Sequence, residues 1–134
     1  MWDEIEAEFN YPVPLGKADC VITREVTEQP FPFQAVFCVS ILDHLNQVDE
    51  STMPSLVRSA LKEVLLKSRT MGFGVVACSL LRGGWRVSAS RAFDAMVSVV
   101  EGFRDYDGQL VIYSAIQKHH DYLMGLAQSY GLLR

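Results

Sequence analysis

The chain has 134 residues, 49% of them hydrophobic, which fits one folded domain and excludes a disordered polypeptide. It carries 12 Lys and Arg against 16 Asp and Glu, and the net charge of −4 disfavours broad electrostatic binding to a nucleic-acid backbone. The longest apolar runs, such as residues 110–112, are far shorter than the ~20 residues of a membrane-spanning helix, and the acidic first residues are unlike a secretion signal. We therefore expect a cytoplasmic protein without a membrane segment.

Residues 1–14 are predicted to form a short acidic helical cap. Trp2, Ile5 and Phe9 recur at the spacing of one helix face, and the prolines at the end of the segment must stop the helix. Such a stripe either packs on its own domain or docks a partner, which could be a second copy of the chain. The acids that make this segment negative are Asp3, Glu4, Glu6 and Glu8.

Two strands are predicted after this cap. Residues 19–27 are rich in β-branched side chains, and residues 35–42 form an almost continuous apolar run. Continuous rather than alternating apolarity is typical of a strand buried on both faces, as in a parallel sheet covered by helices. The second strand is therefore predicted to lie inside such a sheet.

A strong amphipathic helix is predicted from Pro54 to the residue before Gly72. Apolar side chains recur along it at helical spacing, and charged side chains cover the remaining face. Ser51 or Thr52 can cap its start, Pro54 fits its first turn, and Gly72 can close its end in a left-handed conformation.

The same alternation then repeats to the end of the chain. It predicts a strand over residues 74–81, a helix capped by Ser88 or Ser90, a strand over residues 110–116 and a helix over residues 120–130. Alternating strands and helices with short connections favour right-handed crossovers and a mostly parallel sheet. The predicted fold is one α/β domain over residues 1–134, a three-layer α/β/α sandwich with helices on both faces of the sheet.

The turn after the third predicted strand is the first place to look for a site, because ligands of open α/β sheets lie beyond the carboxyl ends of strands. Two glycines let the backbone approach an anion, and the following helix directs its positive end to the same place. A phosphate or diphosphate site is the functional interpretation. The alternative is a tight turn with solvated arginines and a tryptophan that caps the core. The candidate ligand-binding residues of this turn are Arg82, Gly83, Gly84, Trp85, Arg86 and Ser88, with Arg91 as a further source of charge.

Three histidines offer weaker candidates. Asp43 and His44 follow the predicted strand over residues 35–42, on the ligand side, and they either form an acid-base pair there or belong to a loop without a chemical role. His119 and His120 point about 100° apart on a helix, so they are poorly placed to share a metal ion. We count Asp43 and His44 among the ligand-binding candidates and predict no metal site.

The cysteines predict structure rather than chemistry. Cys20, Cys38 and Cys78 lack the paired spacing of a zinc site, and we expect them to be small buried thiols in a reducing compartment. No serine lies in a Gly-x-Ser-x-Gly sequence, which disfavours a serine hydrolase. No cofactor is predicted.

The order of elements in the second half resembles the C-terminal half of a macrodomain, the ADP-ribose-binding α/β/α module. In that family a strand of the type Ala-x-Pro-x-Leu runs into a loop resembling Ser-Thr-Gly-x-x-Gly, which wraps the diphosphate and the distal ribose. Here residues 71–81 resemble that strand, Leu81 matches its final leucine and Gly84 matches the first loop glycine. The resemblance implies that residues 82–90 bind a nucleotide diphosphate of the ADP-ribose type.

Two family motifs are absent from the chain. Macrodomains carry a Gly-Asp-Ile segment whose aspartate reads the adenine, and an Asn-Ala-Ala-Asn segment that addresses the distal ribose and supports hydrolysis; neither occurs here. The resemblance then implies either a trimmed domain with a changed ligand or a degenerate one that binds protein, such as a homo-oligomer. Hydrolysis of ADP-ribosyl groups is a subordinate expectation because the asparagine segment is missing.

Overall fold

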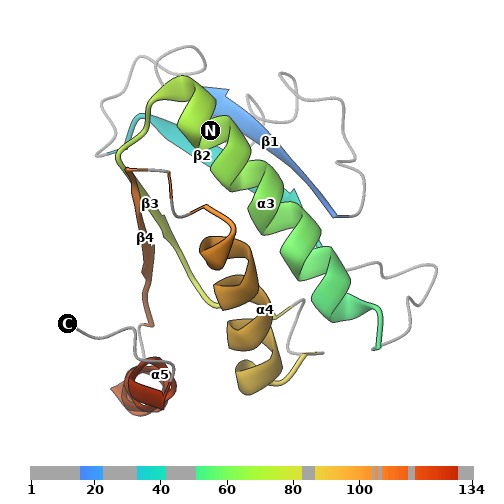
Figure 1. Ribbon diagram of the computed structural model, residues 1–134, viewed down its shortest axis with the longest axis vertical. Helices are drawn as coiled ribbons and strands as arrows, with labels where there is room; N and C mark the ends of the chain where they lie inside the picture. The colour runs from blue at the N-terminus through green and yellow to red at the C-terminus, as the bar shows by residue number, and fades with distance from the viewer. Residues whose placement is uncertain are drawn as a thin grey trace.

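The computed structural model describes residues 16–22, 33–41, 51–82, 87–103, 105, 107–114 and 117–129. These residues form an α/β arrangement, and the predicted cap over residues 1–14 lies outside them (Figure 1). No helix in this part of the chain combines the length and apolarity needed to cross a membrane. In chain order the elements are β1 (Lys17–Ile22), β2 (Ala35–Ser40), α3 (Met53–Met71), β3 (Val75–Cys78), α4 (Ala89–Glu101), β4 (Gln109–Ile112) and α5 (Gln117–Ser129).

The strands pair in two small sheets. β1 and β2 are antiparallel, with Lys17 opposite Ser40, whereas β3 and β4 are parallel, with Val75 opposite Gln109. The prediction that residues 35–42 form a strand is confirmed over Ala35–Ser40, but its expected place in a parallel sheet was wrong. The strand is half-buried along its whole length. Its pairing was mispredicted because continuous apolarity indicates burial and does not specify whether the neighbouring strand is parallel or antiparallel.

α3 follows the prediction closely. Pro54 lies in its first turn, and Gly72 ends it with a φ of 75°, a left-handed conformation that glycine adopts without cost. Thr52 is the N-cap residue, although its side chain makes no capping hydrogen bond. The buried face of α3 consists of Met53, Pro54, Val57, Ala60, Leu61, Val64, Leu65 and Ser68.

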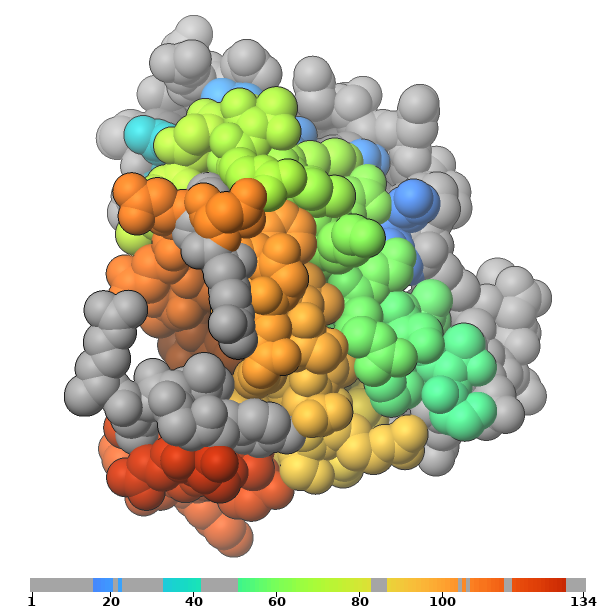
Figure 2. All heavy atoms as spheres, viewed as in Figure 1, coloured from blue at the N-terminus to red at the C-terminus, as the bar shows by residue number. Residues whose placement is uncertain are grey.

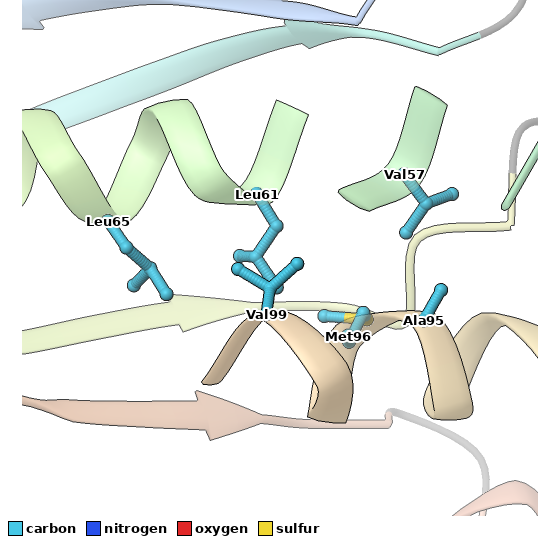
Figure 3. Packing of buried hydrophobic residues seen from close by; sticks show 6 residues of the cluster. All are labelled: Val57, Leu61, Leu65, Ala95, Met96 and Val99. Carbon is cyan, nitrogen blue, oxygen red and sulfur yellow. The ribbon is translucent and has the colours of Figure 1, made fainter. Parts of the chain in front are cut away.

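The main core lies between α3 and α4. Val57, Leu61 and Leu65 of α3 meet buried residues of α4, and partly buried residues of β3 and β4 pack against them (Figure 3). The α4 members of this cluster are Ala95, Met96 and Val99, and the strand members include Cys78, Leu110 and Ile112. Figure 2 shows the outer side of this helical layer, where α3 and α4 lie side by side over the strands.

One face of the second sheet is open. Exposure alternates along β3 and β4, so that Val76 and Cys78 lie toward the helices while Val75 is 61% exposed. The strand predicted over residues 74–81 is confirmed over Val75–Cys78, but its predicted burial was wrong for alternate residues, because α3 and α4 cover one face only. α5 begins at Gln117, three residues earlier than predicted, and contributes no buried residue. It lies at the end of the molecule opposite β1 (Figure 1). The described strands form one layer, and α3 and α4 form a second layer over them.

Candidate functional site

The turn between β3 and α4 is closed at its base by a pair of hydrogen bonds. The backbone N–H of Val87 donates to the carbonyl oxygen of Arg82 at 3.1 Å. In the opposite direction, the Nε–H of Arg82 donates to the carbonyl oxygen of Val87 at 2.8 Å. Both bonds join the same two residues, so Arg82 and Val87 are held together. The half-buried Arg82 side chain thus has a structural role in the turn itself.

Ser88 serves the helix that follows. It is the N-cap of α4, with extended backbone angles, and its Oγ accepts a hydrogen bond from the backbone N–H of Arg91 at 3.3 Å. The Ser88 carbonyl oxygen accepts from Ala92 at 2.9 Å, as in a regular first turn. The sequence-based capping prediction for Ser88 is confirmed. The side-chain oxygen predicted to contact a ligand is used for this cap.

The turn is anchored where two helices begin. Val87, with 2% exposure, packs in a small cluster with Met53 at the start of α3 and Ala92 in α4. Leu56 and Leu80 pack against this cluster. The N-terminal ends of α3 and α4 therefore lie close together beyond the carboxyl end of β3 (Figure 1). Backbone N–H groups in the first turn of a helix carry a partial positive charge, which makes this edge suitable for an anion.

The predicted ligand-binding residues are only partly placed by the structure. Arg82 and Ser88 are brought to the two ends of one short turn. Arg91 lies in the first turn of α4 and is exposed. The remaining candidates, Gly83, Gly84, Trp85, Arg86, Asp43 and His44, lie outside the described residues.

A cavity of about 1000 Å³ lies between β2 and β3, and the sequence did not predict it. Phe37 and Val39 line it from β2, Leu61 and Val64 from α3, and residues 73–79 from the β3 side. Leu81 also lines it, immediately before Arg82. The cavity thus runs along β3 toward the turn that holds the candidate anion site. We refer to this cavity as the inter-sheet groove.

The remaining titratable candidates show no arrangement for metal binding or nucleophilic catalysis within the described ranges. His120 Nδ1 lies 3.7 Å from Asp121 Oδ1, and both side chains are exposed. Burial raises the pKa of the Cys78 thiol to about 11, and burial together with the Asp19 carboxylate raises that of Cys38. A raised pKa leaves less nucleophilic thiolate at neutral pH, which fits inert structural thiols. Cys20, Cys38 and Cys78 form no disulfide within the described part of the chain, and they are half-buried where the sequence predicted buried thiols.

Comparison with known proteins assigns the chain to no family. No protein-family model matches the chain, and no curated protein matches it. The resemblance to macrodomains therefore remains a hypothesis that rests on the sequence features and on the geometry of the turn.

Proposed function

We propose that the chain is a macrodomain-like module that binds a nucleotide diphosphate of the ADP-ribose type at residues 82–90, without strong hydrolase activity. The observation that carries the proposal is the closed turn between Arg82 and Val87, which leads directly into the N-terminus of α4. The diphosphate would lie against the amides at this end of the helix.

The electrostatics of the turn support an anionic ligand. Ser88 Oγ accepts from the N–H of Arg91, which leaves the amides of Ala89 and Ser90 as the donors at the start of the helix. Two arginines, Arg82 and Arg91, stand at the two ends of this short region in a chain whose net charge is −4. Local positive charge of this kind attracts phosphate even when the whole protein is acidic.

The proposed fold is the three-layer α/β/α sandwich expected from the sequence. The parallel pair of β3 and β4, joined through α4, supports it, because parallel neighbours connected by a helix are the unit from which such sandwiches are built. The absence of the Asn-Ala-Ala-Asn sequence supports binding rather than hydrolysis.

Titration of the ¹⁵N-labelled chain with ADP-ribose tests the nucleotide proposal. We expect saturable shifts of the Ala89 and Ser90 amide resonances, and no such shifts with adenosine, which lacks the phosphates. Arg82→Gln should weaken binding at least tenfold because it removes a charge and opens the turn. Lys118→Gln, an equal charge change on exposed α5, is the matched control and should bind as the unaltered chain does. Unmoved amides at millimolar ADP-ribose would refute the proposal.

A second candidate function is protein interaction, and the inter-sheet groove favours it. The groove is large, and its lining includes exposed apolar side chains such as Phe33 and Tyr113. Exposed apolar surface of this kind is typical of interaction sites. Binding of protein in the groove and of nucleotide at the turn involve different residues, so the two functions can be tested separately.

A further inference from the structure

The backbone of β3 turns hydrogen-bonding groups toward the inter-sheet groove. The carbonyl oxygens of Gly74 and Cys78 accept from β4, at 2.9 Å from Gln109 and 3.0 Å from Tyr113. In a parallel ladder, alternate residues direct both their N–H and their carbonyl oxygen to the same neighbour. Val75 and Ala77 therefore direct theirs away from β4, to the side where the groove lies.

β2 has the matching arrangement on the other side of the groove. The Ser40 carbonyl oxygen accepts from the Gly16 N–H at 2.7 Å, so the backbone of Ser40 faces β1. Alternation along an antiparallel strand then turns the backbone groups of Phe37 and Val39 to the opposite edge. Both residues line the groove. Among the described strands, β2 pairs with β1 and β3 with β4, so neither of these edges has a strand partner.

The groove is large enough to hold one strand. Figure 3 shows β2 and β3 pointing the same way on either side of α3, as neighbouring strands of one sheet would. A strand of six residues is about 20 Å long, and with a strand spacing of ~4.8 Å and a sheet layer of ~10 Å it fills about 950 Å³. The cavity measures about 1000 Å³. The groove therefore has room for one extended segment of this length between the two edges.

The lining determines what kind of segment fits. Leu61 and Val64 of α3 form an apolar floor, and Val75 and Tyr113 are apolar or aromatic side chains on the exposed face of the second sheet. No Asp, Glu, Lys or Arg lines the groove among the residues that the structure describes. An uncharged strand can bury the side chains of one of its faces against α3 here, whereas a diphosphate would lose its hydration without gaining a counter-charge.

We propose that the inter-sheet groove accepts one extended, uncharged segment of about six residues from a partner polypeptide. The segment would hydrogen-bond to β2 on one side and to β3 on the other, and so convert the two sheets into a single five-stranded sheet. Its β-branched or aromatic side chains would pack on the α3 floor. This mode of binding combines backbone hydrogen bonds for affinity with side-chain contacts for specificity, as in other strand-addition complexes. The proposal does not depend on nucleotide binding at the turn.

Selection from a displayed library of eight-residue peptides, with apolar residues at alternating positions, tests the proposal on the full chain. The selected peptide is then synthesised, and hydrogen exchange is measured with and without it. We expect at least tenfold protection of the amides of Phe37, Val39, Val75 and Ala77. N-methylation of alternate peptide amides should weaken binding at least tenfold, because it removes hydrogen bonds to one edge without altering the protein.

Two protein variants provide a second readout. Ala77→Pro removes a groove-facing N–H and leaves the β4 bonds of β3 in place, so it should also weaken binding at least tenfold. Tyr122→Ser, on the exposed face of α5, is the control and should bind normally.

The proposal is overturned if no selected peptide protects the four amides, or if N-methylation leaves affinity unchanged. Protection of the same amides by dimerisation without peptide would instead assign the groove to a second copy. The ADP-ribose titration is expected to be unchanged whichever of these results is obtained. Failure of the groove proposal can therefore be distinguished from failure of the nucleotide proposal.

Discussion

Ser59 Oγ donates a hydrogen bond to the carbonyl oxygen of Gly16 at 2.7 Å, which links the middle of α3 to the start of β1. Gly16 has a φ of 73°, and a Cβ at this position would lie 3.2 Å from Ser59 Oγ and 3.4 Å from a Leu56 methyl carbon. The chain therefore needs glycine here for two reasons, its left-handed backbone and its closeness to α3.

Gly16→Ala should lower the free energy of unfolding by more than Gly72→Ala does. Gly72 has a similar φ of 75°, but a Cβ there would meet nothing within 4 Å. Gly72→Ala should thus show the backbone cost alone, about 1–2 kcal/mol, and Gly16→Ala should add the cost of displacing α3. Urea denaturation of the two variants measures the difference. Equal losses would show that the contact with Ser59 adds no cost.

Ser88→Ala should destabilise the protein by about 1 kcal/mol, because it removes the side-chain acceptor that caps α4. Ser88→Asp retains an acceptor next to the positive end of the helix and should keep most of the stability. Ser90→Ala is the control, since Ser90 is exposed and is not the N-cap. Thermal unfolding followed by circular dichroism makes the comparison; a loss in Ser90→Ala that matched Ser88→Ala would contradict the assigned cap.

Ser68→Ala should raise the free energy of unfolding by about 1 kcal/mol. The Ser68 hydroxyl is fully buried in α3 and has no hydrogen-bond partner among the residues that the structure describes, so the folded protein bears the cost of its desolvation. The control is Ser98→Ala in α4, where Oγ donates to the Ala95 carbonyl oxygen at 2.7 Å. Both variants gain helix propensity, and only Ser98→Ala loses a bond. Urea denaturation should rank Ser68→Ala as the more stabilising change, and the reverse order would argue that Ser68 has a partner.

The thiol of Cys78 should react with iodoacetamide slowly at neutral pH, with a rate midpoint near pH 11 rather than 9.0. A Cys20→Ala, Cys38→Ala variant isolates this thiol. Since the folded-state pKa is raised, the contribution of Cys78 to stability is fully present below about pH 9 and is lost as the pH rises through 11. Alkylation rates across this range, measured beside glutathione, test the assignment, and a midpoint at or below 9.0 would contradict the burial of the thiol.

The helices could be predicted from sequence because their determinants are local. The apolar spacing from Met53 to Leu65, together with Pro54 at the start and Gly72 at the end, specifies α3 without knowledge of any neighbour. The Ser88 cap of α4 was predictable for the same reason.

The pairing of the strands could not be predicted in the same way. The apolar run that contains Phe37 and Val39 indicates that a strand is buried, but the same letters suit a parallel or an antiparallel neighbour. The inter-sheet groove depends on which strands pair, so no local pattern indicates it. The glycine pair in the sequence predicts an anion site, whereas no local pattern indicates that Arg82 Nε and Ser88 Oγ form hydrogen bonds within the turn and the helix cap.

Among the described strands, β2 and β3 each have one edge without a strand partner, and these edges also affect how the protein behaves when it is concentrated. An unpaired edge with apolar flanks is a template for neighbouring copies, and the described part of β2 carries none of the lysines or prolines that discourage such stacking. Overproduction of the chain by itself should therefore yield inclusion bodies or fibrous deposits. Co-expression with a peptide that fills the space between the two sheets should instead increase the recovery of dispersed protein.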